Sequence, residues 1–478
     1  MEIYRETILY QLIKITIRKN GKTTNKYIYI LNRNNMSRVF LKRTLTAGKV
    51  DPTFPVLTQN VDADGPLSGF RIIDLSQMVS GPMATQILGD QGADIIKVES
   101  PAGAAERGGG RSKISSPMAS VVNRNKRSIS VDLKTPEGIE IIKKLVKGAD
   151  GFIHNFRPGA MERAGLGYDD LKQINESLVY LHITGFGATG PYSKKRVYDP
   201  VIQSASGLAS IQADENGRPR LFRLIVPDKV TSLTASQAMT AGLLKRAKTG
   251  KGSHIELSML DALIQFAWAE GFARETFQHG QDNTREYIRD MVFETKDGYI
   301  TAGAVQDKEW IGMCNALGRP EWITDERFAT GAARSANRQL RLDLTESVLK
   351  TMTTEQALAK LTEHDVPNGI VNHPRQKVLE DPQVLNNEML FTYHHPHAPF
   401  PLLQARGAAK FNGQPFAVRH PAELLGQSTE LLLKEMGYTT EQVAQLLEKG
   451  IVVSKNPTKF DLEREAQKSP AMRDVSSG

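Results

Sequence analysis

Short apolar segments alternate with helical segments along most of this chain, and this alternation restricts its fold more than any other feature. Residues 70–76 (Phe-Arg-Ile-Ile-Asp-Leu-Ser) are typical of a buried strand. Ser80-Gly81-Pro82 then favours a helix start, because a proline in the first turn lacks an N–H that the helix does not use. Residues 93–99 are a second apolar segment. Strand, helix and strand within ~30 residues predict a parallel crossover unit.

The alternation continues beyond this first unit. Further strands are predicted at 127–133, 151–155, 178–184 and 253–257, and helices at 136–147, 160–163, 168–175, 231–246 and 259–277. This pattern predicts an α/β fold with a parallel sheet.

Changes in composition and in the hydrophobic pattern along the chain predict five segments. We expect a basic, disordered N-terminal extension at 1–64, the N-terminal part of a large domain at 65–275, a small domain at 276–375, the C-terminal part of the large domain at 376–455, and a disordered tail at 456–478. The small domain is predicted from charged loops and amphipathic helices, which replace the strand–helix alternation there.

The basic charge of the chain is confined to its first residues. The net charge is +8, but residues 1–50 hold 11 Lys and Arg against 2 Glu, and the remaining residues hold 50 basic and 51 acidic groups. A nucleic-acid partner is therefore not indicated, and no apolar run of ~18 residues predicts a membrane span. The single cysteine, Cys314, excludes an intrachain disulfide and favours a reducing compartment. We expect a cytoplasmic protein, or a mitochondrial matrix protein if the basic N-terminal segment is a transit peptide.

Two motifs are weaker than they first look. Gly185-Phe-Gly187-Ala-Thr-Gly190 has the spacing of a dinucleotide site, but the sequence after it does not predict the helix that would face a pyrophosphate. The histidines of 394–397 have no carboxylate or cysteine at ligand spacing, so we predict no metal site.

A cluster of cations follows two of the predicted strands. Asn155-Phe156-Arg157 lies at the carboxyl end of a strand, where open α/β sheets bind ligands, and Arg163 follows one helical turn later. Residues 123–127 add three more cations. These charges and Phe156 suit a phosphorylated ligand that carries an adenine. A solvated basic surface is the alternative.

Asp228 follows an apolar run and a proline just before a predicted long helix. An acidic residue at this position is usually a helix N-cap. The functional alternative is a carboxylate that attacks a carbonyl, made more nucleophilic by partial desolvation and kept ionised by the helix N-terminus.

Taken together, these motifs resemble the family III CoA-transferases, which include the formyl-CoA and carnitine CoA-transferases. The resemblance runs from Pro66 to about Val453 and includes Asn123-Arg-Asn-Lys-Arg-Ser128, Asn155-Phe-Arg-Pro-Gly159 and Pro227-Asp-Lys-Val-Thr231. It implies that Asp228 is the nucleophile. It also implies CoA contacts at Gln77, Met78, Val79, Asn155, Phe156, Arg157, Ala160, Arg163 and Arg196. Val79 and Ser100 depart from the formyl-CoA transferase pattern, which argues against formyl-CoA as the donor.

The resemblance implies a fold and a reaction. The fold is a Rossmann-like parallel-sheet large domain built from N- and C-terminal parts, with a smaller α+β domain, in an interlocked homodimer. The reaction moves CoA from a donor acyl-CoA to an acceptor carboxylic acid through aspartyl anhydride and aspartyl-CoA thioester intermediates. Coenzyme A and acyl-CoA are substrates, and no tightly bound cofactor is expected.

Two alternatives stay open at this point. An acyl-CoA racemase of the same superfamily uses the equivalent aspartate as an acid/base together with a histidine, but this chain has Tyr198-Asp199 where that histidine would stand. A non-catalytic CoA-binding module would need Asp228 to be inert.

Overall fold

A computed structural model describes residues 65–108, 116–273, 275–276, 290–393, 395, 401–415 and 418–454, with the backbone of three strands nearer the N-terminus. These strands are β1 (Tyr10–Lys19), β2 (Lys22–Arg33) and β3 (Met36–Leu41), which pair antiparallel in the order β1-β2-β3. The sequence analysis expected no regular structure in 1–64. β-Branched and aromatic residues that alternate with polar ones favour strands in this segment. The tail predicted at 456–478 lies outside the described residues.

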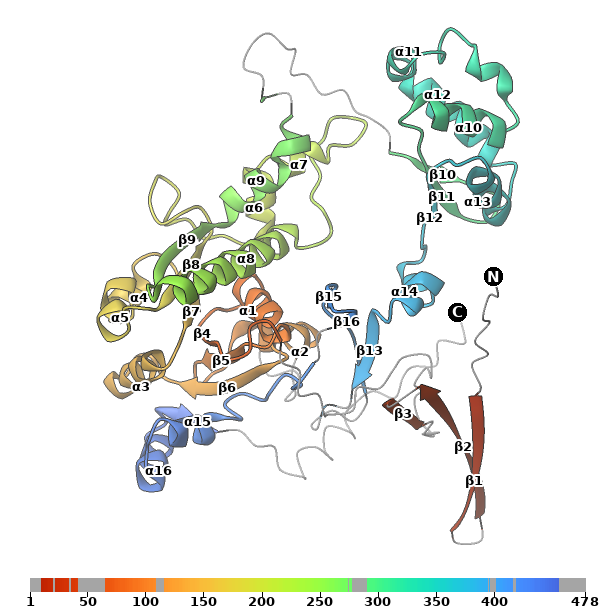
Figure 1. Cartoon of the computed structure of the whole chain (residues 1–478). Coiled ribbons are helices and arrows are strands. Elements are labelled where there is room, and N and C mark those ends of the chain that lie inside the picture. Colours follow the sequence, from red (N-terminus) through yellow and green to blue (C-terminus); the bar gives the residue numbers. More distant parts are fainter. Residues whose placement is uncertain are drawn as a thin grey trace. The chain divides into compact units, whose positions relative to one another are not determined.

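The chain divides into two compact units, and the first comprises residues 1–208, 222–269 and 388–478. Its centre is a seven-stranded sheet (Figure 1). Its strands, in spatial order, are β17 (Val452–Val453), β6 (Lys126–Val131), β5 (Asp94–Glu99), β4 (Arg71–Asp74), β7 (Gly151–His154), β8 (Val179–Thr184) and β9 (Ser253–Ser258). Strands β4 to β9 pair parallel, and β17 is antiparallel. In chain order the six parallel strands lie 3-2-1-4-5-6, which is the doubly wound Rossmann order.

The strands are apolar on both faces, and successive residues enter two different cores. Ile72 and Ile95 pack in one core, while their neighbours Ile73 and Ile96 pack in the other. The first core also holds residues of α1 (Ser80–Asp90), α8 (Val226–Thr249) and α9 (Met259–Gly271). The second holds residues of α3 (Pro136–Lys147), α5 (Tyr168–Ile174), α15 (Thr429–Glu435) and α16 (Thr440–Glu448). Since helices cover both faces, a parallel sheet is the stable arrangement.

A second unit comprises residues 209–221 and 270–387. Its antiparallel sheet has β10 (Val292–Glu294), β11 (Tyr299–Ala302) and β12 (Asn368–Ile370). Helices α10 (Asp307–Ala316), α11 (Gly331–Ala336), α12 (Arg338–Leu349), α13 (Thr354–Glu363) and α14 (Pro382–Asn386) belong to this unit. It has its own core, which includes Trp310, Phe328 and Leu349. The small domain predicted from the sequence is 276–375.

The remaining elements are short. They are η1 (Ala105–Arg107), α2 (Pro117–Val122), α4 (Ala160–Arg163), α6 (Asp199–Ala205), α7 (Leu208–Ile211), η2 (Pro320–Ile323), η3 (Arg375–Leu379), β13 (Leu390–Tyr393), β14 (Leu402–Ala405), β15 (Lys410–Phe411) and β16 (Gln414–Pro415). The predicted α/β fold, with a parallel-sheet large domain and a smaller α+β domain, is confirmed.

Candidate active site

The strand order reverses between β4 and β7. The chain leaves β4 for one face of the sheet and leaves β7 for the other, so the two following loops diverge at the carboxyl edge. Doubly wound folds bind ligands at this point. The β4–α1 loop carries Gln77, Met78 and Val79, and the β7–α4 loop carries Asn155 and Phe156. The fold therefore brings together five of the residues that the resemblance assigned to CoA.

Asn155 joins the two loops. Its carboxamide oxygen accepts a hydrogen bond from the Gln77 N–H (2.8 Å), and its amide nitrogen donates to the Gln77 carbonyl (2.8 Å). Both hydrogen bonds are to backbone groups, so the Asn155 side chain fixes the β4–α1 loop in place. Its amide also lies 3.4 Å from the Ser80 hydroxyl, at the start of α1.

The β4–α1 loop is strained. Met78 has φ 65°, in the left-handed region that costs a residue other than glycine about 1–2 kcal/mol. Its side chain is 38% exposed, whereas the Val79 side chain is only 4% exposed. Gly81 follows in the first turn of α1, where a Cβ would lie 2.1 Å from the Ser76 Cβ, so only glycine fits.

Asp228 lies near this loop, and it is not the helix cap that its sequence position suggested. α8 begins at Val226, earlier than the predicted 231, so Asp228 is its third residue. Ile225 occupies the N-cap position without a side-chain hydrogen bond. The Asp228 carboxylate instead lies beside Ser80, the first residue of α1, whose backbone N–H and hydroxyl act to lower the pKa of Asp228.

Helix α8 is also tied to this loop through its own backbone. The hydroxyl of Ser232, one turn after Asp228, donates to the Asp228 carbonyl (2.7 Å) and lies 3.5 Å from the Val79 carbonyl. The Asp228 carboxylate is thus held near the N-terminus of α1, where the helix dipole favours an anion.

The surroundings of Asp228 make it unusually basic for a carboxylate. Burial raises its pKa, and the nearby Asp199 carboxylate raises it further, to about 6, although the Ser80 hydrogen bonds oppose the shift. Asp199 is buried, and its Oδ2 accepts the Asp228 N–H at 3.3 Å. Gln203 donates to Asp199 Oδ1 (2.6 Å), which fixes Asp199 beside Asp228. At neutral pH Asp228 is mostly ionised and is more nucleophilic than a solvated carboxylate.

Two neutral histidines hold the backbone of Phe156. The Phe156 N–H donates to His154 Nδ1 (3.3 Å), and the Phe156 carbonyl lies 2.9 Å from His182 Nε2. Burial lowers the pKa of both histidines, most strongly that of His154. An unprotonated His154 Nδ1 is required for the first bond. His154 of β7 and His182 of β8 therefore hold the β7–α4 loop at the end of the sheet.

Two of the candidate cations lie on or next to this loop, whereas Arg124 and Lys126 are buried and pair with Asp90 and Asp74. Arg157 and Arg163 are exposed, and Ala160 begins α4. The Arg163 guanidinium lies over Gly159, whose added Cβ would be 2.8 Å from Arg163 Nη1. Arg196 is exposed in another loop, and among the described residues no hydrogen bond or ion pair connects it to the other candidates.

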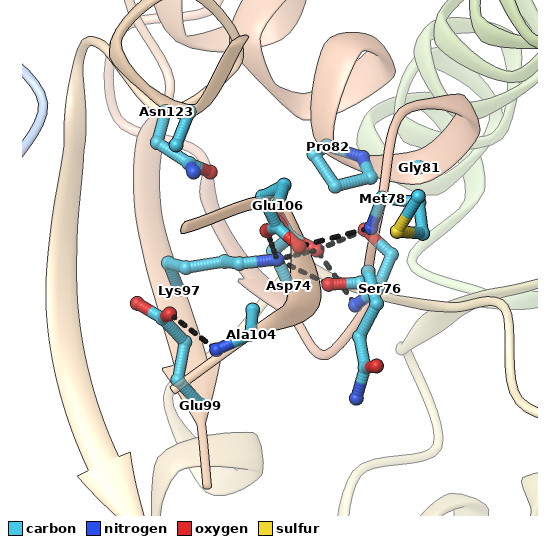
Figure 2. A network of polar contacts seen from close by, with 12 residues as sticks. Asp74, Ser76, Met78, Gly81, Pro82, Lys97, Glu99, Ala104, Glu106 and Asn123 are labelled. Carbon is cyan, nitrogen blue, oxygen red and sulfur yellow. Dashed lines mark hydrogen bonds and ion pairs between the residues drawn. The ribbon is translucent and has the colours of Figure 1, made fainter. Parts of the chain in front are cut away.

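Buried charges lie directly beneath the β4–α1 loop (Figure 2). Lys97 and Asp74 are neighbours on β5 and β4, with Nζ and Oδ1 3.8 Å apart. Lys126 Nζ contacts Asp74 Oδ2 (3.0 Å), and Lys97 Nζ lies 3.5 Å from Glu106 Oε1. All four side chains are at most 1% exposed.

In this network, each lysine and its neighbouring carboxylate oppose the effect of burial on the other's pKa. Burial alone would raise the pKa of Asp74, but Lys126, Lys97 and hydrogen bonds from Ser76 and Thr85 hold it well below the usual range. Burial lowers the pKa of Lys126 to about 8, although Asp74 opposes the shift.

Sequence reasoning missed Ser80, Glu106 and the Asp74–Lys97–Lys126 network. A usable signal was present, because Asp74 and Lys97 lie within otherwise apolar strands and a buried charge needs a partner. No such signal pointed to Ser80 or Glu106.

The fold and site define an α/β enzyme with a carboxylate near the carboxyl edge of its parallel sheet, and the comparisons with known proteins identify its family. The sequence profile of CoA-transferase family III matches residues 67–429. This chain belongs to CoA-transferase family III.

Individual relatives agree with this assignment. Human (Homo sapiens) succinyl-CoA:glutarate CoA-transferase is 34% identical over 403 residues, which cover 81% of this chain and 90% of the human protein. Formyl-CoA:oxalate CoA-transferase of Streptomyces avermitilis is 29% identical, over 81% of this chain and 99% of that protein. The crystal structure of a CAIB/BAIF family protein from Brucella suis has a TM-score of 0.68 and 31% identity, over 78% of this chain and 100% of that chain.

The described residues contain neither a metal-binding cluster nor a membrane-spanning helix. No group of three or more His, Cys, Asp or Glu side chains there is arranged to hold a metal ion. No helix among those residues is long and apolar enough to cross a membrane.

Proposed function

We propose that this enzyme transfers CoA from an acyl-CoA to a carboxylic acid through covalent intermediates on Asp228. The observation that carries this proposal is the Asp228 carboxylate, partly desolvated and beside the β4–α1 loop and the N-terminus of α1. A carboxylate in such a place can attack a thioester and later leave again.

The reaction begins when an Asp228 oxygen attacks the thioester carbonyl carbon. The C–S bond breaks, CoA leaves as a thiolate, and an aspartyl mixed anhydride remains. The thiolate then attacks the aspartyl carbonyl carbon, which releases the donor acid and forms an aspartyl-CoA thioester. The acceptor carboxylate attacks that thioester and displaces the thiolate again. Finally the thiolate attacks the acceptor carbonyl of the second anhydride, which gives the new acyl-CoA and frees Asp228.

We assign dicarboxylic acids as the substrate class. The relative with 34% identity is named for succinyl-CoA and glutarate, and a second, from Agrobacterium fabrum, is named succinate–glutarate CoA-transferase with the same identity over 67% of this chain. Succinyl-CoA as donor and a short dicarboxylate as acceptor are the first pair to test. The departures at Val79 and Ser100 argue against a formyl-CoA donor.

CoA itself would lie along the β7–α4 loop. Exposed Arg157 and Arg163 suit its phosphates, and Gln77 lies next to this loop through its hydrogen bonds with Asn155. Asn155 contributes by fixing the Gln77 backbone. Arg196 would complete the contacts.

A racemase is not favoured. The relatives described above are named as transferases, and Tyr198 stands where the second base of a racemase would lie. Asp199, the next residue, acts on Asp228 by raising its pKa.

Large apolar side chains that are exposed on the single chain support a homodimer. Leu233 and Leu244 of α8 are 57% and 55% exposed, and Phe266 of α9 is 63% exposed. Exposed apolar residues of this size are typical of association surfaces. Light scattering that measures a single chain at working concentration would contradict the dimer.

The covalent intermediate gives the direct test of the proposal. We expect enzyme incubated with succinyl-CoA and no acceptor to gain the mass of an adduct, and hydroxylamine to convert Asp228 to a hydroxamate found by peptide mass spectrometry. A racemase would give no adduct and would exchange the α-proton of its acyl-CoA with deuterated water, so that pair of results would overturn the proposal.

The pH profile should follow the charge on Asp228. Because only the ionised carboxylate attacks, kcat/KM should fall below a pH near 6. Asp199→Asn removes a neighbouring negative charge but keeps an oxygen for the Asp228 N–H, so the acidic limb should move to lower pH. An unchanged limb in Asp199→Asn would show that Asp199 does not act on the titrating group.

A further inference from the structure

The β4–α1 loop is held residue by residue by side chains from other parts of the chain. The Ser76 carbonyl accepts from Lys97 Nζ, and Asn155 holds both backbone groups of Gln77. The Met78 N–H donates to Glu106 Oε2 (3.0 Å). The carbonyl of Pro82, in the first turn of α1, accepts from Lys126 Nζ (2.8 Å). Figure 2 shows Lys97 and Glu106 meeting directly under this loop.

Glu106 is the unusual member of this set. Its side chain is fully buried, and among the described residues its Oε1 accepts no hydrogen bond and has Lys97 Nζ at 3.5 Å. Burying a carboxylate with an incomplete set of partners costs free energy, so the contacts that Glu106 does make are expected to have a function. Those contacts are the Met78 N–H and Lys97, and Met78 is the strained residue of the loop.

The position of Glu106 is itself fixed. It lies in η1, where the preceding Ala104 N–H donates to Glu99 Oε2 (3.1 Å) and the following Arg107 pairs with Glu99 Oε1 (2.6 Å). Glu99 ends β5, so the chain is attached to the central sheet on both sides of Glu106. Glu106 therefore transmits the position of the sheet to the loop.

We propose that Glu106 is a positioning residue: it holds Met78 in its left-handed conformation and thereby sets the start of α1 against the Asp228 carboxylate. Only Val79 separates Met78 from Ser80, which lies beside the Asp228 carboxylate. The Ser232 hydroxyl also connects the two segments, because it donates to the Asp228 carbonyl (2.7 Å) and lies 3.5 Å from the Val79 carbonyl. A change in the backbone of Met78 would displace both Val79 and Ser80. This inference rests on the proposed role of Asp228, and it concerns the rate of acyl transfer to that residue rather than CoA binding.

The first arm of the test compares Glu106→Ala and Glu106→Gln with the wild type. The rate of adduct formation from succinyl-CoA should fall about 10- to 100-fold in Glu106→Ala, because a small displacement of catalytic groups costs that much. Glu106→Gln keeps an oxygen for the Met78 N–H and should lose less. The Kd for CoA should rise much less than the rate falls, since Arg157 and the α4 residue Arg163, which suit the CoA phosphates, are untouched.

The second arm is a double-mutant cycle with Met78→Gly. Glycine adopts a positive φ without strain, so the loop no longer needs Glu106 to hold it. Glu106→Ala should therefore slow adduct formation much less in the Met78→Gly background than in the wild-type background. A merely structural role for Glu106 would give the same loss in both backgrounds.

Asp90→Asn is the matched control. Asp90 is also a buried carboxylate and pairs with Arg124 (2.6 Å), but it lies at the far end of α1. The Asp90→Asn substitution should lower the melting temperature of the protein, and it should slow adduct formation by no more than about 2-fold. A wild-type rate in folded Glu106→Ala, or an equal loss in both Met78 backgrounds, would overturn the inference. Absence of any adduct in the wild type would instead contradict the proposed function.

Discussion

Asp228→Asn should lose CoA transfer by at least about 10³-fold while the protein becomes more stable. The activity falls because an amide cannot form and release the aspartyl anhydride, and loss of a covalent nucleophile is not replaced by binding alone. Steady-state assays with succinyl-CoA and a panel of carboxylic acids measure this. Retention of near wild-type turnover would remove Asp228 from the reaction.

The gain in stability follows from the sign of the pKa shift. The pKa of Asp228 is raised from 3.8 to about 6 on folding, so an ionised Asp228 destabilises the folded state at pH values above 6. Replacement by the neutral amide should raise the free energy of unfolding by about 3 kcal/mol at pH 8. The gain should shrink between pH 6 and 4, where the wild-type carboxyl is protonated in the folded state. Thermal unfolding of both proteins across this pH range tests it.

Asp74→Asn should be among the most destabilising single substitutions in the large domain. Asp74 is fully buried and faces both Lys97 and Lys126. Its removal leaves two buried lysines with one carboxylate, Glu106, near Lys97, and a broken buried ion pair costs about 3–5 kcal/mol. The expected fall in melting temperature is roughly 6–20 °C. Calorimetry at pH 7 measures it.

The pH of the comparison matters for Asp74. Its pKa is held below the usual range in the folded protein, so its stabilising effect is complete above the unfolded value near 4 and is lost as pH falls through the lower folded value. Glu140→Gln serves as the control, because Glu140 forms an exposed ion pair with Lys143 (3.1 Å) that should contribute less than about 1 kcal/mol. Equal effects of the two substitutions would show that the buried network does not stabilise the domain.

These two substitutions separate the two tasks of the site. Asp228 is a reactive group whose environment costs stability, and Asp74 belongs to the support beneath the loop that faces it. A stabilised Asp228→Asn and a destabilised Asp74→Asn would together show that the strain at this site is offset by the buried charges below it.

Much of the architecture could be predicted from local sequence. Strands such as β4 and β5 are apolar at successive positions, so that Ile72 and Ile73 enter different cores, and this pattern belongs to a parallel sheet covered on both faces. The sequence also predicts a ligand-binding loop at Asn155 and Arg157, because they follow the carboxyl end of a strand in a parallel sheet. Asp228 was identified as a candidate through its motif.

What Asp228 and its neighbours do was decided by the tertiary structure. The sequence position of Asp228 suggested a helix cap, but α8 begins earlier, so its side chain lies beside Ser80 of another helix instead. Asn155 and Gln77 are 78 positions apart and meet only because β4 and β7 are neighbours in the sheet. The contact of Glu106 with Met78 likewise depends on where η1 is attached. Local sequence determines periodicity and turn chemistry, whereas burial and charge pairing arise from the order in which distant strands assemble, and these set the pKa and the reach of a catalytic group.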